Sequence, residues 1–394
     1  MTKTIMLIAG EASGDHYGAA LMTSLKKQSK DALMFIGVGG ESMEKEGLVS
    51  TFSMKELSHM GIVEILPHLP NLYKRLRELV DLAESKKPDV LVTIDCPEFS
   101  LRVAKRLHYL PMPLIHCVAP SVWAWRPGRA KKMAGFLDHL ITLFPFEPPY
   151  FLKHGLSATF CGHPISQQPL GSAKTFLKTC PWTAKEKMVL LLPGSRTGEV
   201  ERLLPLMLAA CRKLKETDSA LRFGIVTYPA VTQAIKTLVG EDGAFHLIDH
   251  AQKWDAFAAA HMALAASGTV TLELAHAGVP MVVLYKFSAL TGMLGRMLIQ
   301  SPWGSLVNIL ANKAVVEELI QEDCTEESII KASRTLLSHK EARDKQKATF
   351  NHLRFQLQPP GGGTPSDLAA AVILNRIICP LNDYRRLPVG SSSV

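Results

Sequence analysis

Residues 189–196 read VLLLPGSR and residues 266–273 read ASGTVTLE, and each stretch joins an apolar segment to a turn of small residues. The pattern predicts a buried strand, a tight turn and the start of a helix in both places. Such a turn leaves backbone N–H groups unpaired at the helix N-terminus, where the helix dipole favours an anion. Arg196 adds a cation beside the first turn, and Glu273 adds an acceptor beyond the second. Together the two stretches indicate a site for the diphosphate of a sugar nucleotide.

The composition indicates a globular protein with two domains. The chain has 394 residues, of which 47% are hydrophobic and 20% are charged. This length exceeds the size at which a single core stops growing. The net charge of +8 suits acidic ligands or an anionic membrane surface. Nucleic acid is not expected as a partner, because the sequence has no dense stripe of Lys and Arg interleaved with aromatic residues.

The cysteines and histidines argue against a disulfide framework and a metal centre. The seven cysteines are scattered without a CxxC pair, which fits a reducing cytoplasm. The fourteen histidines show no ligand spacing and no Asp-x-Asp occurs, so we expect no metal and no cofactor. Charges interrupt every apolar run before the roughly 18 residues that a membrane-spanning helix requires, and the run at 5–9 is too short for a signal peptide.

Strand and helix patterns alternate along the chain, which predicts the α/β class with parallel sheets. The predicted strands are 4–9, 33–38, 89–94, 113–118, 138–143 and 157–160 in the first half, and 187–193, 221–226, 244–248, 262–265 and 280–285 in the second. From residue 314 onward the pattern is helical. The stretch 164–175 loses this periodicity and gains Pro, Gly and Ser, which predicts a linker.

We therefore predict two Rossmann-like domains that face a cleft, one over residues 1–165 and one over residues 176–345. The ligand is expected in that cleft, at the carboxyl ends of the strands. Helices within residues 346–394 are expected to return to the first domain or to contact a partner, after a hinge at 359–363.

Acidic residues follow two predicted strands of the first domain. Asp95 comes directly after an apolar run, where a carboxylate is placed to act as a general base. Capping of the next helix is the alternative role for Asp95. In the turn GEASGD at 10–15, Glu11 and Asp15 place further carboxylates at the edge of the cleft. A plain turn with Ser13 or Asp15 as the helix cap is the alternative there.

Two other segments suit parts of a glycolipid. In PSVWAWR at 120–126, Trp123 is suited to stacking on a sugar and Arg126 to holding a phosphate. A core pair of tryptophans beside a solvated basic face is the alternative. The apolar segment 54–76 is a candidate for contact with acyl chains or a membrane surface, and an ordinary buried helix is the alternative.

The sequence resembles the lipid-A-disaccharide synthase family in an ordered set of motifs. They are AGEASGD (9–15), GVGG (37–40), MGIVEIL (60–66), IDCPEF (94–99), PSVWAWR (120–126), CGHP (161–164), LPGSR with Glu199 (192–199) and ASGTVTLE (266–273). Each motif alone is weak evidence. Their order over nearly the whole chain is specific.

The resemblance implies a B-type two-domain glycosyltransferase (GT-B) fold and an inverting, metal-independent reaction. That family transfers 2,3-diacylglucosamine from its UDP donor to 2,3-diacylglucosamine 1-phosphate, also called lipid X. The products are a β-1,6-linked disaccharide and UDP, as part of lipid A biosynthesis in Gram-negative bacteria. The implied location is peripheral, on the cytoplasmic face of the inner membrane. Whether the chain forms a homodimer is left open by the sequence.

The resemblance also assigns roles to residues of this chain. Asp95 matches the proposed base, with Glu11 and Asp15 as fallback candidates. The acceptor-binding candidates are Gly14, Trp123 and Arg126, and the donor-binding candidates are Gly194, Ser195, Arg196, Ser267, Gly268, Thr269, Glu273 and Asn308. The family usually has Pro where this chain has Val307, which is expected to loosen the loop that presents Asn308.

Two competing interpretations remain at this stage. A UDP-N-acetylglucosamine 2-epimerase shares the two-domain fold and the donor site, but it would need additional catalytic acids and no surface for acyl chains. A sugar-nucleotide sensor would have the same fold without turnover.

Overall fold

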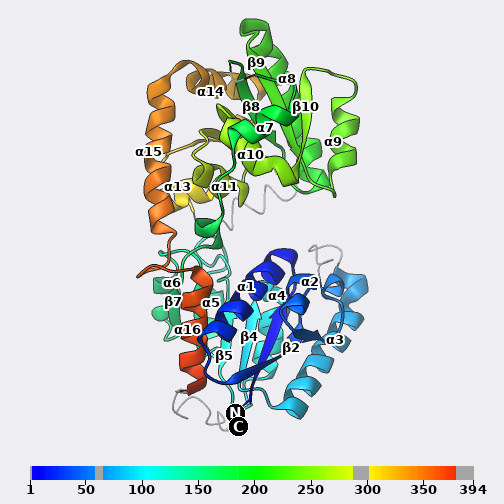
Figure 1. Ribbon diagram of the computed structural model, residues 1–394, viewed down its shortest axis with the longest axis vertical. Helices are drawn as coiled ribbons and strands as arrows, with labels where there is room; N and C mark the ends of the chain where they lie inside the picture. Colours follow the sequence, from blue (N-terminus) through cyan, green and yellow to red (C-terminus); the bar gives the residue numbers. More distant parts are fainter. Residues whose placement is uncertain (1, 58–64, 184, 287–300, 379–394) are drawn as a thin grey trace, which may run out of the picture. The chain divides into compact units, whose positions relative to one another are not determined.

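The computed structural model describes residues 2–57, 65–183, 185–286 and 301–378. The chain divides into two compact units. Unit 1 comprises Met1–Pro164 and Gln358–Val394, and unit 2 comprises Ile165–Leu357. The chain therefore enters unit 2 once and then returns to unit 1 (Figure 1).

The described part of unit 1 contains a seven-stranded parallel sheet in the order β3-β2-β1-β4-β5-β6-β7. Its strands are β1 (Thr2–Ala9), β2 (Ala32–Val38), β3 (Leu48–Ser50), β4 (Val90–Ile94), β5 (Leu114–Cys117), β6 (His139–Thr142) and β7 (Ser157–Phe160). The central strand β4 is buried along its whole length. Helices on both faces cover such a strand, which is why its sequence is apolar without alternation.

Helices cover both faces of this sheet. They are α1 (Ala12–Gln28), α2 (Glu41–Lys45), α3 (Ile65–Lys86), α4 (Pro97–Arg106), α5 (Gly128–Ala134), α6 (Pro148–Leu152) and α16 (Pro365–Ile378). Apolar side chains of α3, α4 and α5 pack on one face, and those of α1 and α16 pack on the other. Helix α16 lies beside α1, although 336 residues lie between the end of α1 at Gln28 and the start of α16 at Pro365.

The return of the chain to unit 1 depends on a short glycine run and on specific contacts of α16. Gly361, Gly362 and Gly363 have φ values of +81°, +85° and +82°, a conformation that glycine adopts readily. Ile373 of α16 is fully buried against the sheet. Arg376 Nη2 donates to His139 Nδ1 at 2.9 Å, which ties the end of α16 to β6.

The described part of unit 2 contains a six-stranded parallel sheet in the order β10-β9-β8-β11-β12-β13. Its strands are β8 (Lys187–Leu192), β9 (Leu221–Thr227), β10 (Phe245–Asp249), β11 (Met262–Ala266), β12 (Met281–Tyr285) and β13 (Glu317–Ile320). Its helices are α7 (Ala173–Thr179), α8 (Thr197–Thr217), α9 (Thr232–Val239), α10 (Lys253–Ala259), α11 (Val270–Ala277), α13 (Leu306–Ala311), α14 (Glu326–Ser338) and α15 (Lys340–Gln356). Helices α8, α9 and α14 pack on one face, and the others pack on the opposite face.

The short 3-10 helices complete the described elements. They are η1 (Met54–Glu56), η2 (Pro164–Gln167), η3 (His250–Gln252) and η4 (Gln321–Asp323).

The predicted α/β class with two Rossmann-like sheets is confirmed, and three details differ from the sequence analysis. Strand β3 was not predicted, and β13 lies in the segment that was predicted to be helical from residue 314 onward. Both are short edge strands, so they bury too few side chains to leave a clear pattern. The boundary expected at residue 346 falls inside α15, which packs on unit 2. No helix among the described residues is long and apolar enough to cross a membrane.

Candidate active site

In each unit the strand order reverses between two neighbouring strands, and ligands of doubly wound sheets bind at such switch points. In unit 2 the reversal lies between β8 and β11, which pair in parallel. The turns that follow these strands are the glycine-containing turns of VLLLPGSR (189–196) and ASGTVTLE (266–273). In unit 1 the reversal lies between β1 and β4, and these strands lead into the turn at 10–15 and into Asp95. The predicted site residues are thus concentrated at both switch points.

The turn after β8 presents a cation at the start of a long helix. Gly194 has φ +120°, and a Cβ there would lie 2.5 Å from the Glu199 carboxylate, so the position requires glycine. Ser195 is exposed, and the side chain of Arg196 is 82% exposed. Arg196 precedes the 21-residue helix α8 and donates to Glu199 Oε1 at 3.0 Å. An anion at this turn would meet both the guanidinium and the positive end of α8.

The turn after β11 presents backbone groups at the start of α11. Gly268 and Thr269 are exposed, and Thr269 occupies the N-cap position of α11. The Ser267 hydroxyl donates to the carbonyl of Gly304 at 2.6 Å, so this side chain secures the neighbouring loop. Because β8 and β11 are adjacent, this turn lies next to the turn that carries Arg196.

Glu273 of α11 is engaged by a residue that the sequence analysis did not identify. Lys253 Nζ donates to both carboxylate oxygens of Glu273, at 2.9 Å each, and the two side chains are 17% and 19% exposed. Lys253 also lies 5.9 Å from the ring centre of Tyr228, which directly follows β9. Burial raises the pKa of Tyr228 to about 12, and the charge of Glu273 contributes to this shift. Tyr228 could have been selected from the sequence as a site candidate, because it lies just after the predicted strand 221–226. The contact of Lys253 with Glu273 could not, because no local pattern links the two positions.

Asn308 was expected to contact the donor, but its side chain is buried and bonded within unit 2. It is 1% exposed, and its amide nitrogen donates to the carbonyl of Val316 and to Glu318 Oε1. Its amide oxygen accepts the backbone N–H groups of Val315 and Val316. The side chain therefore has no hydrogen-bonding capacity left for a ligand in this arrangement.

The turn that presents Asn308 is well anchored without the family's proline. Val307 is fully buried in the core of unit 2. The Ser305 hydroxyl caps α13 by accepting the backbone N–H of Asn308 at 3.3 Å.

Asp95 lies at the switch point of unit 1 in a strained turn. Asp95 and Cys96 have φ values of +51° and +45°, which are unusual for residues other than glycine. Residues held in this region cost of order 1–3 kcal/mol each and cluster at functional sites. The Asp95 carboxylate accepts the backbone N–H of Cys96 at 2.8 Å. Burial raises the pKa of Asp95, although this hydrogen bond opposes the shift.

The fallback base Asp15 has a structural role instead. It is 5% exposed and accepts the backbone N–H groups of Gly40, Ser42 and Met43 at 2.8, 3.0 and 3.0 Å. Burial opposes its charged form, but these hydrogen bonds outweigh burial and lower the pKa. Asp15 therefore caps α2, and the alternative expectation that it caps its own helix is wrong.

The other residues of the first turn separate into exposed and buried positions. Glu11 is exposed at the N-cap position of α1, beside the turn that carries Asp95, because Gly10 packs directly against Cys96. Gly14, an expected acceptor contact, is buried between α1 and β4, where a Cβ would lie 3.5 Å from the carbonyl of Ile94. Gly14 therefore serves helix packing and does not reach the surface.

The segment after β5 places Trp123 and Arg126 in different surroundings. Arg126 is exposed, with its guanidinium 4.2 Å from the ring centre of Trp125 and 3.9 Å from Glu98. Trp123 is half-buried, and its indole N–H donates to Glu147 Oε1 at 3.4 Å. Glu147 was not identified from the sequence, because its contact with Trp123 depends on the neighbouring ends of β5 and β6.

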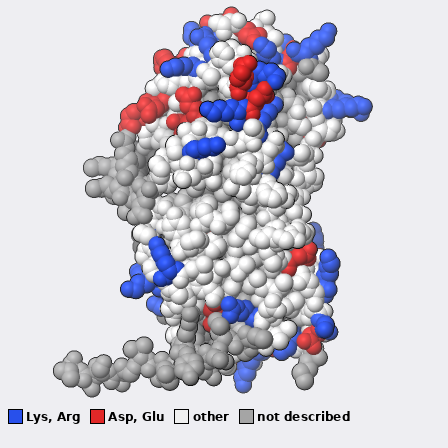
Figure 2. All heavy atoms as spheres, turned by 90° about the vertical axis from the view of Figure 1, so that its left-hand side faces the viewer, with Lys and Arg blue, Asp and Glu red and all other residues white. Residues whose placement is uncertain are grey.

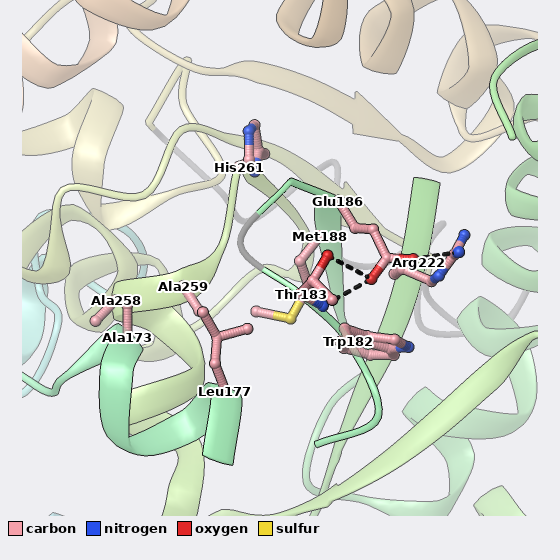
Figure 3. A pocket seen from close by; sticks show the side chains of 10 residues that line it. All are labelled: Ala173, Leu177, Trp182, Thr183, Glu186, Met188, Arg222, Ala258, Ala259 and His261. Atoms are coloured by element: carbon pink, nitrogen blue, oxygen red, sulfur yellow. Dashed lines mark hydrogen bonds and ion pairs between the residues drawn. The ribbon is translucent and has the colours of Figure 1, made fainter. Parts of the chain in front are cut away.

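The pocket shown in Figure 3 lies at the opposite edge of the unit 2 sheet. Met188 and Arg222 on its wall are near the first residues of β8 and β9, and His261 directly precedes β11. Within unit 2, the predicted donor residues therefore lie at the other ends of the same strands. No group of three or more His, Cys, Asp or Glu side chains among the described residues is arranged to hold a metal ion.

The 54–76 segment is described in part, because residues 58–64 lie outside the described residues. Leu76 is buried in the core of unit 1, and Tyr73 is 59% exposed.

Comparison with solved structures identifies the fold. The chain resembles UDP-GlcNAc 2-epimerase from Neisseria meningitidis bound to UDP-GlcNAc, with a TM-score of 0.60 at 13% identity, covering 96% of this chain and 100% of the other. It also resembles MurG of Acinetobacter baumannii, with a TM-score of 0.58 at 14% identity, covering 95% and 99%. The predicted GT-B fold is confirmed, and at such identities these likenesses establish the fold alone.

Comparison of sequences identifies the family. The model of the lipid-A-disaccharide synthetase family matches residues 5–369. The lipid-A-disaccharide synthase of Rhodospirillum centenum is 42% identical over 379 residues, covering 95% of this chain and 94% of the relative. That of Gluconobacter oxydans is 41% identical over 388 residues, covering 98% and 93%. The chain therefore belongs to the lipid-A-disaccharide synthase family of glycosyltransferases, enzymes of lipid A biosynthesis.

Proposed function

We propose that the enzyme joins UDP-2,3-diacylglucosamine to lipid X by a single displacement that inverts the anomeric carbon. The observation that carries this proposal is the placement of the predicted residues at two switch points. A strained, partly buried carboxylate lies at one, and two turns that each open a helix lie at the other. This division suits a reaction in which one unit activates an alcohol and the other holds a nucleotide leaving group.

Asp95 is the proposed general base. The acceptor's 6-hydroxyl loses its proton to the carboxylate as its oxygen forms a bond to the anomeric carbon of the donor. The bond between that carbon and the diphosphate oxygen breaks, and its electron pair leaves with UDP. Burial raises the pKa of Asp95, which makes the ionised carboxylate a stronger base.

Arg196 and the helix N-termini at the two turns are the proposed partners of the leaving diphosphate. Negative charge grows on UDP as its bond to the sugar breaks, and fixed donors stabilise that charge without reorganising. Gly194, Ser195, Ser267, Gly268 and Thr269 are proposed to supply or shape these donors. We propose that Glu273 accepts from the ribose hydroxyls, since its carboxylate oxygens keep lone pairs beyond those used by Lys253.

The experiment that tests this function follows UDP release from UDP-2,3-diacylglucosamine in the presence and absence of lipid X, in excess EDTA. We expect UDP release that requires lipid X and yields a β-linked disaccharide. No metal is expected to be needed, because charge on the diphosphate is met by Arg196 and helix dipoles.

Three results would contradict the proposal in different ways. Formation of an epimerised UDP-sugar without disaccharide would favour the epimerase interpretation. UDP binding without turnover would favour the sensor. Activity that requires added Mg²⁺ would show that a carboxylate site for a metal has been overlooked.

We further propose that the enzyme is peripheral on the cytoplasmic face of the inner membrane and that unit 1 contacts the lipid. Helices α4 and α5 are neighbours, since Arg129 of α5 pairs with Glu98 of α4. They carry five exposed cations: Arg102, Lys105, Arg106, Lys131 and Lys132. By contrast, Figure 2 shows Lys and Arg mixed with Asp and Glu where α14 and α15 of unit 2 face the viewer. Basic side chains near an anionic surface each contribute about 1 kcal/mol of attraction.

Sedimentation with lipid vesicles tests this contact. We expect binding to vesicles that contain anionic lipid, release by high salt because screening weakens the attraction, and no binding to neutral vesicles. The double variant Lys131→Glu/Lys132→Glu should bind several-fold more weakly. The matched control, Lys345→Glu/Lys347→Glu on α15, should bind like the wild type. Equal loss in both variants would attribute binding to net charge rather than to unit 1.

A further inference from the structure

A chain of aromatic contacts runs along the carboxyl edge of the unit 1 sheet. Trp123 meets Phe146 edge to face, with ring centres 5.4 Å apart. Phe146 stacks on Phe144 at 5.7 Å, and Phe144 stacks on His163 at 5.3 Å. These rings come from the segments that follow β5, β6 and β7. We call Trp123, Phe146, Phe144 and His163 the aromatic row.

The aromatic row is not part of the core of unit 1. Each of its side chains is half-buried, and Trp123, Phe144 and Phe146 are absent from the two clusters of apolar side chains that pack on the faces of the sheet. Single exposed apolar residues are common on protein surfaces, whereas large contiguous apolar patches mark binding surfaces. The row leaves four neighbouring rings partly exposed at one edge of the sheet, and its Trp and Phe rings lie outside both core clusters.

A buried carboxylate holds the aromatic row in place. Glu147 is 2% exposed and accepts the backbone N–H groups of Leu143 and Phe144 at 3.2 and 3.0 Å. Its other oxygen accepts the indole N–H of Trp123. One side chain thus fixes the backbone that carries Phe144 and the ring of Trp123. Burial raises the pKa of Glu147 to about 7, which shows how costly this arrangement is to the charged form.

The chemistry of the row favours an apolar ligand. The polar group of Trp123 is already used by Glu147, so the indole offers a ring rather than a donor. Phe144 and Phe146 have no polar atoms in their side chains. The three successive ring contacts, at 5.3–5.7 Å, offer several apolar faces one after another, which suits an extended hydrocarbon chain better than a single hexose.

The row lies on the same sheet edge as Asp95, since β4, β5, β6 and β7 are consecutive neighbours in the sheet. We propose that the aromatic row binds an acyl chain of the acceptor, and that Glu147 is the positioning residue of this surface. This proposal rests on the proposed function, because it takes lipid X as the acceptor. It assigns the row to acceptor recognition and leaves the donor to unit 2.

The test compares acceptors whose acyl chains differ in length. For the wild type we expect kcat/KM to rise with chain length. In Phe144→Leu/Phe146→Leu this rise should flatten, with roughly a tenfold loss for the longest chains and little change for the shortest. UDP affinity should be unchanged. Phe355→Leu is the matched control, since Phe355 is 73% exposed on α15 and should not alter the profile.

Glu147→Gln provides a second arm with the same readout. The amide has a single oxygen, so it cannot accept from both the Leu143–Phe144 backbone and Trp123. We expect a partial flattening of the chain-length profile. A full chain-length dependence in the Phe144→Leu/Phe146→Leu variant would overturn the inference while leaving the proposed function intact. A wild type that does not consume lipid X would instead overturn the proposed function.

Discussion

Asp95→Asn should lower kcat by at least about 100-fold while leaving UDP affinity unchanged. Asparagine keeps the size of the side chain and can still accept the backbone N–H of Cys96, but it cannot take a proton from the acceptor. UDP affinity should hold because the turns that we propose to bind the donor belong to unit 2. Turnover at saturating substrates and UDP binding by calorimetry measure the two effects separately.

Glu98→Gln is the matched control for this variant. It removes a carboxylate three residues away, which lies on the surface and pairs with Arg129. A change of less than about threefold in kcat is expected, as for a surface ion pair outside the reaction. Normal turnover by Asp95→Asn would move the base to Glu11, which is exposed in the adjacent turn. Asp15 is not an alternative, because its carboxylate is occupied in capping α2.

The pH dependence of kcat/KM for the wild type should also reflect the role of Asp95 as a general base. A general base must be ionised, so kcat/KM should rise as pH increases through the raised pKa of Asp95 and level off above it. A raised carboxyl pKa also means that the folded state binds protons more tightly than the unfolded state. The contribution of Asp95 to stability therefore falls as pH rises through this range. Asp95→Asn should lose that dependence, as measured by chemical unfolding at several pH values.

Glu273→Ala should weaken UDP binding by about 1–3 kcal/mol, because a contact to the ribose is lost. At saturating donor, kcat should change much less. Glu201→Ala, an exposed acid on α8, is the control and should bind UDP like the wild type. A large fall in kcat with unchanged UDP affinity would contradict the assignment of Glu273 to the nucleotide.

The ion pair with Lys253 requires one further variant. Glu273→Ala also leaves the ammonium of Lys253 without its carboxylate in a mostly buried position. Glu273→Ala/Lys253→Met removes both charges. If UDP binding stays weak in the double variant, the lost ribose contact is the cause. If binding recovers, the unpaired ammonium was responsible, and Glu273 has no direct role.

Local sequence patterns were sufficient to predict the fold class and the turns that carry Asp95 and Arg196. The buried strands β4 and β8 are continuous apolar runs, and each leads into a turn whose residue types are dictated by tight geometry. Because parallel strands end at one edge of a sheet, these runs also predicted that Asp95 and Arg196 follow the carboxyl ends of strands. The strand order, which puts both residues at switch points, comes from the structure. Predicting these turns requires only the residue types within a few positions of each turn.

The remaining features depend on contacts between distant segments, which have no periodic signal. Asp15 caps α2 across 28 residues of sequence, where a cap of its own helix was the local expectation. Glu147 holds Trp123 across 24 residues, and Asn308 is consumed by the backbone near β13. In each case the partner group lies outside the helix that contains or directly follows the polar side chain, and only the folded chain brings the two together. A sequence shows that such a side chain is polar, but not which group will satisfy it.

The return of α16 to unit 1 constrains the order in which the two units can fold during translation. Unit 2 is contiguous in the chain, so all its residues are available once residue 357 has left the ribosome. Unit 1 is translated first, yet the face of its sheet that α16 covers stays open until residues 365–378 emerge. Domains generally fold as units during synthesis, starting with the N-terminal one. Here unit 1 is complete only after unit 2 has been translated, and the part of its sheet face that α16 covers beside α1 is accessible to chaperones in the interval.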